Sequence, residues 1–142
     1  MITKTKNCCL GFACLLTLIP GVVLAERFQF AAIGDVPYTS AAQLDCLVEC
    51  INKLPVKFTI HVGYIKSGST PCSDEVFEGV KRQFMSLEAP LIYTPGDNEW
   101  TNCHRKNNGP YDPLERLQKL RQMFFGTNLS LSRYPVELES TS

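Results

Sequence analysis

The stretch LIYTPGDNEW, residues 91–100, decides the fold, because an apolar run reaches a Pro-Gly break and then delivers two carboxylates, an amide and the only tryptophan. An apolar run followed by glycine and an acidic residue is typical of a buried parallel strand that ends at a ligand crevice. Two earlier stretches repeat the pattern: Phe28–Ile33 before Gly34-Asp35, and Phe58–Val62 before Gly63-Tyr64. In the second of these, a tyrosine stands where the other two have an aspartate.

Helices are predicted between and after these strands. Ala41–Leu54 has apolar residues at helical spacing, and Ser73 followed by two acidic residues is typical of a helix start. Asp112–Glu115 combines a capping aspartate with proline and begins a last helix that runs to Gly126. The apolar stripe of that helix is expected to contain Leu114, Leu117, Leu120 and Phe124. The order β-α-β-α-β-α predicts an α/β fold with a parallel sheet and right-handed crossovers.

The carboxyl ends of parallel strands meet at one edge of a sheet, so one candidate site is expected there. Its members would be Asp35, Tyr64, Asp97, Asn98 and Glu99. Carboxylates and amides suit divalent cations, and two such ions can hold a phosphate and ionise a water molecule. The chain has neither a phosphate-binding Gly-x-x-x-x-Gly-Lys loop nor a Gly-x-Ser-x-Gly elbow.

Three motifs that follow the strands resemble those of the calcineurin-like metallophosphoesterase superfamily: Gly34-Asp35, His61-Val62-Gly63 and Pro95–Trp100. The likeness is closest to the exported bacterial branch, whose third motif reads Gly-Asp-Asn-Glu-Trp followed by Cys-His, as in Cys103-His104 here. It covers roughly Phe28 to Phe125. The resemblance implies the first half of an αββα sandwich and a site that hydrolyses phosphoesters with metal-activated water.

The resemblance also implies roles for individual residues. Asp35, Asp97 and Asn98 would be metal ligands, and Asn98 and His104 would take part in catalysis. The implied cofactors are divalent ions of the Mn, Fe, Zn or Mg class, and the implied partner is a small phosphoester. Lys66 is expected to offer a cation to phosphate or to lie in a flexible turn. Glu99 is expected at the substrate, behind a metal ligand, or in solvent.

The sequence departs from the family in three respects. Tyr64 stands where the family has the carboxylate that bridges both metals, and a phenol with a reference pKa near 10 is neutral at pH 7. Pro37 replaces a histidine of the first motif. Further histidines come from a later half of the family's domain, whereas His61 and His104 are the only two here, and His61 is favoured as a core residue. We therefore expect an impaired hydrolase, or alternatively a non-enzymatic exported binding or interaction module.

Residues 1–25 are interpreted as a signal peptide, because Lys4 and Lys6 precede the apolar stretch Cys8–Ala25. The prediction is export to the periplasm or secretion, with an uncleaved anchor as the alternative and no other membrane contact. A truncated metallophosphoesterase-like domain is expected over 26–126 and a tail over 127–142. With the family's second sheet missing, an uncovered sheet face would favour self-association.

Charge and cysteine content limit the other function classes. Lys plus Arg and Asp plus Glu number 14 each, so the chain has no excess of positive charge for binding nucleic acid. Four cysteines follow residue 25, and they allow three pairings. Cys72 and Cys103 both lie on loops, which favours a bridge between them. Cys46 and Cys50 lie one helical turn apart, where disulfide geometry is awkward, so half-buried free thiols are expected.

Overall fold

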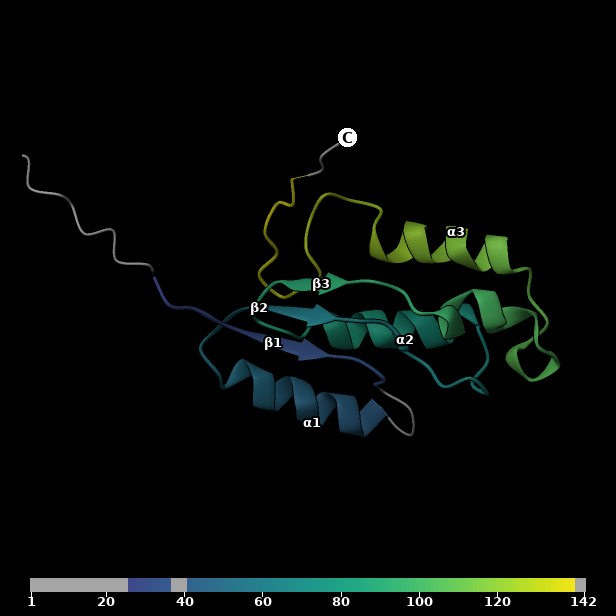
Figure 1. The fold of residues 1–142 in the computed structure, drawn as a ribbon, viewed down its shortest axis with the longest axis horizontal. Helices are drawn as coiled ribbons and strands as arrows, with labels where there is room; N and C mark the ends of the chain where they lie inside the picture. Colours follow the sequence, from purple (N-terminus) through teal and green to yellow (C-terminus); the bar gives the residue numbers. More distant parts are fainter. Residues whose placement is uncertain (1–25, 37–40, 140–142) are drawn as a thin grey trace, which may run out of the picture.

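The computed structural model describes residues 26–36 and 41–139, and its strands and α-helices follow one another in the predicted order (Figure 1). They are β1 (Gln29–Ile33), α1 (Ala41–Asn52), β2 (Val56–His61), α2 (Asp74–Phe84), β3 (Leu91–Tyr93), the 3-10 helices η1 (Asp97–Glu99), η2 (Thr101–His104) and η3 (Lys106–Asn108), and α3 (Pro113–Phe124). The predicted α/β class with a parallel sheet is confirmed. Two predictions, the signal segment 1–25 and the replacement at Pro37, lie outside the described residues. Within these residues, no helix has the length and apolar character needed to cross a membrane.

The strand order β1-β2-β3 determines where the helices lie. Both strand pairs are parallel, and Ile33, His61 and Tyr93 are in register across the sheet. Right-handed crossovers that always step in the same direction place their helices on one face of the sheet. The buried residues Thr59 and Leu91 point to this face. The described residues therefore build one covered face and one open face.

The covered face carries the core. His61, Tyr93, Phe84 of α2 and Phe124 of α3 form a ring cluster with centroid distances between 5.0 and 6.2 Å. Leu44, Val48 and Ile51 of α1 are buried on the same side. In Figure 1, β2 passes in front of α2.

The open face is apolar. Phe30 and Phe58 stack with ring centroids 5.3 Å apart, and Phe28 lies 6.0 Å from Phe58. Phe28, Phe30, Val62 and Ile92 are all exposed. Among the described residues, no helix covers this surface.

The start of α3 is as predicted, but its buried stripe is so only in part. The Asp112 carboxylate accepts a hydrogen bond from the Glu115 N–H at 2.9 Å, and proline occupies the first turn. Leu114 is 70% exposed, so its predicted place in the core is wrong. Leu120 and Phe124 are buried as predicted, and Arg116 is the third buried residue of the helix. Three polar contacts described below hold Arg116 against the core.

The segment expected to be a tail lies beside the sheet. Leu131 pairs antiparallel with Leu91 of β3 through two backbone hydrogen bonds of 3.0 and 3.3 Å. Ser130, Leu131 and Ser132 are buried. In Figure 1, this yellow segment returns from α3 to β3. The packed unit thus extends past residue 126.

Leu120→Ala is expected to lower the free energy of unfolding by about 2–5 kcal/mol, because it leaves a cavity among fully buried side chains. Leu114→Ala removes the same atoms from an exposed position of the same helix, so its effect should stay within about 0.5 kcal/mol. Urea unfolding followed by circular dichroism measures both values. Equal costs at the two positions would contradict the observed orientation of α3.

Candidate functional site

The three strand ends meet at three glycines. A Cβ on Gly63 would lie 2.5 Å from the Gly96 nitrogen, and a Cβ on Gly34 would lie 2.6 Å from Val62 Cγ2. Real Cβ atoms essentially never approach other atoms so closely, so the packing requires residues without side chains at these points. The predicted convergence of the loops at one edge is therefore confirmed.

Asp35 and Tyr64 directly follow two of these glycines, and both have left-handed backbone conformations. Their φ angles are 56° and 61°. The Asp35 N–H donates to the Gly63 carbonyl at 3.2 Å, which places the two strand ends side by side. Aspartate tolerates this conformation, whereas for a bulky side chain it costs on the order of 1–3 kcal/mol. Tyr64 therefore occupies a position whose backbone suits aspartate or asparagine better.

His61 is a fully buried residue of the sheet. Its Nδ1 accepts from the Gly63 N–H at 3.2 Å, and its Nε2 lies 3.2 Å from the Val36 carbonyl oxygen, to which it donates in the neutral tautomer. Burial lowers the pKa of His61, outweighing its hydrogen bond to Val36 and the nearby charge of Asp35. The favoured interpretation as a hydrogen-bonded core histidine agrees with this geometry.

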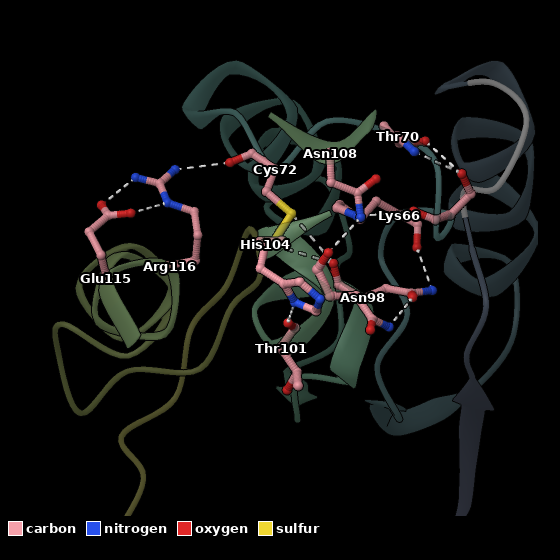
Figure 2. Close-up of a disulfide and its surroundings, with 12 residues drawn as sticks. Lys66, Thr70, Cys72, Asn98, Thr101, His104, Asn108, Glu115 and Arg116 are labelled. Carbon is pink, nitrogen blue, oxygen red and sulfur yellow. Dashed lines mark hydrogen bonds and ion pairs between the residues drawn. A yellow bond between two sulfur atoms is a disulfide. The ribbon is translucent and has the colours of Figure 1, made fainter. Parts of the chain in front are cut away.

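The Asn98 amide is engaged inside the protein (Figure 2). Its Oδ1 accepts from Asn102 Nδ2 at 3.0 Å, and its Nδ2 donates to the Lys66 carbonyl at 3.3 Å. Asp97, on the same turn, is exposed. The structure thus brings Asn98 into the protein interior and leaves Asp97 at the surface.

His104 lies on η2 with an exposed side chain. Its Nδ1 is 2.8 Å from the Thr101 carbonyl oxygen, within its own turn. Figure 2 shows its ring directed toward Thr101. The catalytic role expected for His104 is untested by this arrangement and remains a prediction.

Lys66 and Glu99 are buried, with 1% and 0% of their surfaces exposed. The alternative that places Glu99 in solvent is therefore wrong, whereas the substrate-binding roles expected for Lys66 and Glu99 remain predictions. Lys66 Nζ donates to the Ser67 carbonyl at 3.0 Å, and Glu99 Oε1 accepts from the Ile65 N–H. Among the described residues, Glu99 Oε2 has no hydrogen-bond partner. The strand-end loops thus fold over both side chains.

Burial shifts both groups toward their neutral forms. It raises the pKa of Glu99 against the opposing effects of the Ile65 N–H and of Lys66. It lowers the pKa of Lys66, with the Glu99 charge acting in the opposite direction. Lys66 and Glu99 are thus two buried ionisable residues whose charges influence each other.

A disulfide joins Cys72 and Cys103, across the loops that precede α2 and contain η2. Its sulfur atoms lie 3.6 and 3.7 Å from the Asn98 carbonyl oxygen. Asn108 is fully buried, donates to the Asn102 carbonyl at 2.9 Å, and through its own carbonyl accepts from the Cys72 N–H at 2.9 Å. The long loop is therefore fastened to the domain at several points.

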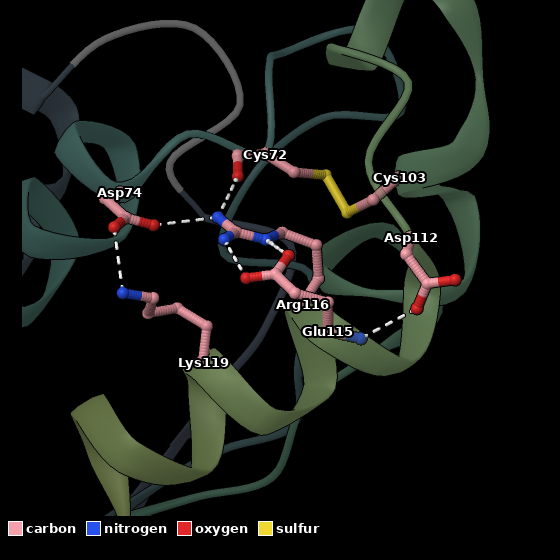
Figure 3. A network of polar contacts seen from close by, with 7 residues as sticks. All are labelled: Cys72, Asp74, Cys103, Asp112, Glu115, Arg116 and Lys119. Carbon is pink, nitrogen blue, oxygen red and sulfur yellow. Dashed lines mark hydrogen bonds and ion pairs between the residues drawn. A yellow bond between two sulfur atoms is a disulfide. The ribbon is translucent and has the colours of Figure 1, made fainter.

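Arg116 is a structural residue that the sequence analysis missed. It donates to the Cys72 carbonyl at 2.9 Å and to Asp74 at 2.8 Å, and it pairs with Glu115 (Figure 3). Its guanidinium carbon lies 4.5 Å from the centre of the Tyr111 ring. Hydrogen bonds from Lys119 and then Arg116 lower the pKa of Asp74. The partner of Arg116 in the backbone, Cys72, is distant in sequence, so no local sequence motif predicts that this arginine is buried.

The described residues do not fit a centre for two metal ions. Asp35 and Asp97 could each offer a carboxylate, but Asn98 already uses both ends of its amide and Tyr64 has a phenol where the resemblance implies a carboxylate. Within ranges 26–36 and 41–139, no group of three or more His, Cys, Asp or Glu side chains is placed to hold a metal ion.

Comparisons with protein-family models, with curated proteins and with solved structures give no match for this chain.

Glu99→Gln is expected to change how stability depends on pH. A carboxyl whose pKa is raised by folding contributes stability that is fully present below its unfolded pKa of about 4.3 and is lost as the pH rises through its folded pKa. Glutamine does not titrate, so the variant should gain stability relative to wild type as the pH rises. Without the Glu99 charge, the pKa of Lys66 falls further in the variant. A lysine with a lowered pKa costs stability at low pH, where it is charged, and this cost disappears as the pH rises. For this second reason too, the variant should gain stability relative to wild type as the pH rises.

Urea unfolding at several pH values from about 4 to about 8 measures this difference, over the range set by the reference pKa. Glu78→Gln changes an exposed carboxylate of α2 and serves as the matched control. A stability difference for Glu99→Gln that is independent of pH would contradict a buried carboxyl with a raised pKa.

Proposed function

We propose that this chain carries the strand-end scaffold of a metal-dependent phosphoester hydrolase whose metal site is impaired, so that it hydrolyses small phosphoesters weakly or not at all. The observation that carries the proposal is the position of Tyr64. It follows Gly63 at the contact with Gly96, beside Asp35, where the resemblance implies a bridging carboxylate. The implied ions are of the Mn, Fe, Zn or Mg class. We also propose export through residues 1–25.

Both the charge and the backbone at residue 64 support this proposal. An aspartate there would add a carboxylate directly after Gly63, whose carbonyl accepts from the Asp35 N–H, whereas tyrosine adds a phenol. The φ angle of 61° is also one that aspartate adopts more readily than tyrosine. The backbone at residue 64 thus has a conformation that suits aspartate better than tyrosine.

Tyr64→Asp is expected to create a response to Mn²⁺ that the wild-type chain lacks. Thermal unfolding of residues 26–142 with and without Mn²⁺ should show stabilisation by the metal in Tyr64→Asp alone. Tyr64→Asn is the matched control, because asparagine also tolerates the left-handed conformation but adds no charge. Both variants share the loss of the tyrosine ring and the relief of backbone strain, so only the carboxylate separates them.

Two outcomes would contradict this assignment. Stabilisation of the wild-type chain by Mn²⁺, with hydrolysis of a chromogenic phosphoester that chelator and Asp35→Ala both abolish, would mean that the site works as it stands. An equal Mn²⁺ response in Tyr64→Asn and Tyr64→Asp would mean that the carboxylate at residue 64 does not matter.

A non-enzymatic interaction module is the second candidate, and the open apolar face supports it. Phe28, Phe30, Val62 and Ile92 are exposed on the face of the sheet that no described helix covers. The loop 96–112, fastened by the disulfide, offers a second and polar surface with exposed His104 and Arg105. We propose a second copy of the chain as the partner of the apolar face, since monomeric proteins rarely expose large contiguous apolar patches.

The double variant Phe30→Ser/Phe58→Ser is expected to shift residues 26–142 from self-associated species toward monomer. The reason is that it removes the stacked ring pair from the open face. Sedimentation velocity over a range of concentrations measures the change. Leu114→Ser, which alters an exposed leucine of α3, is the control and should leave association unchanged. Purely monomeric wild-type protein at all concentrations would contradict this proposal.

A further inference from the structure

Two free thiols lie side by side on the outer surface of α1. The helix buries Leu44, Val48 and Ile51, whereas Cys46 and Cys50 are exposed. The expectation of half-buried thiols is wrong, because at 3.6 residues per turn these two positions lie opposite the buried stripe. Cysteine is among the most frequently buried residue types, so two exposed cysteines on one helical surface need an explanation.

Geometry prevents these thiols from bonding to each other. Side chains four residues apart on a helix have Cβ atoms about 5–6 Å apart, whereas a disulfide requires about 3.5–4.5 Å. An ion between them relaxes this limit, because with metal–sulfur bonds of about 2.3 Å it can join sulfur atoms up to about 4.6 Å apart. The spacing therefore excludes a direct bond but permits both sulfur atoms to reach one ion.

We propose that Cys46 and Cys50 form a two-thiolate binding site for a soft, thiophilic cation, with Cu(I) as its representative. Thiolates select soft ions, whereas the hard ions of the proposed hydrolytic site prefer oxygen. Binding releases one proton from each thiol, so Cu⁺ and two thiols give a bis-thiolate complex and two protons. The site is independent of the strand-end scaffold and of the proposed hydrolysis.

The surroundings favour a two-coordinate ion over zinc. Structural zinc takes four protein ligands. Two acidic residues are adjacent to these thiols in sequence, Asp45 next to Cys46 and Glu49 next to Cys50. Asp45 accepts a hydrogen bond from Gln83 Nε2 at 2.8 Å and is thereby directed toward α2. Across the described part of the chain, no third His, Cys, Asp or Glu completes a metal-binding group. Two sulfur ligands alone suit Cu(I) better than they suit Zn²⁺.

The test is titration of the full chain with Cu(I) under anaerobic conditions, in competition with a chromogenic Cu(I) chelator. Cys8, Cys9 and Cys14 are replaced by serine so that their thiols do not contribute. We expect one Cu(I) per chain, and an affinity at least tenfold lower in Cys46→Ser and in Cys50→Ser. X-ray absorption of the loaded chain should show two sulfur neighbours around copper.

The matched control is the double variant Cys46→Ser/Glu49→Cys. It keeps two exposed thiols on α1 but places them at adjacent positions, which point in directions about 100° apart. It should bind Cu(I) no better than a single-thiol variant. Equal affinity of wild type and this control, or four sulfur neighbours around each copper, would overturn the proposal. Circular dichroism confirms that every variant keeps its helical content, because both positions are at the surface.

Discussion

The close packing of Gly63 against Gly96 is the constraint on which this structure depends. With a Cβ on Gly63 only 2.5 Å from the Gly96 nitrogen, any side chain there would push the ends of β2 and β3 apart. Gly63 also has a φ angle of 91°, which side chains rarely adopt. Gly63 is therefore required both by the close approach of Gly96 and by its own backbone conformation. The positions of the chain segments that follow the strands depend on this contact.

The same packing explains why ionisable residues are buried next to the candidate site. Once the strand ends touch, the loops that leave them must fold back over one another, and Lys66 and Glu99 are enclosed between them. Each of these side chains finds a backbone partner, on Ser67 and Ile65. Burying such groups opposes folding unless they are paired or neutral, which is consistent with the directions of both pKa shifts.

Much of the fold could be predicted because its signals are local. Asp112-Pro113 begins α3, and a glycine follows each strand, so each of these signals can be recognised within a few residues of the sequence. The features that sequence reasoning missed depend on distant partners. Leu131 pairs with β3 forty residues earlier, and Arg116 is buried because it reaches the backbone of Cys72. The convergence of Asp35 and Tyr64 followed from strand topology, whereas the enclosure of Glu99 required the actual path of the loops.

The disulfide gives the chain a closed covalent ring. Cys72 and Cys103 are 31 residues apart, and the ring that they close contains α2, β3 and η1. One edge of the sheet and the helix behind it thus belong to a single loop of covalent bonds. A break in any one peptide bond inside this ring would leave the two pieces of the chain connected through sulfur. The third strand and its loop are therefore held to the rest of the protein by two independent routes, one along the backbone and one across it.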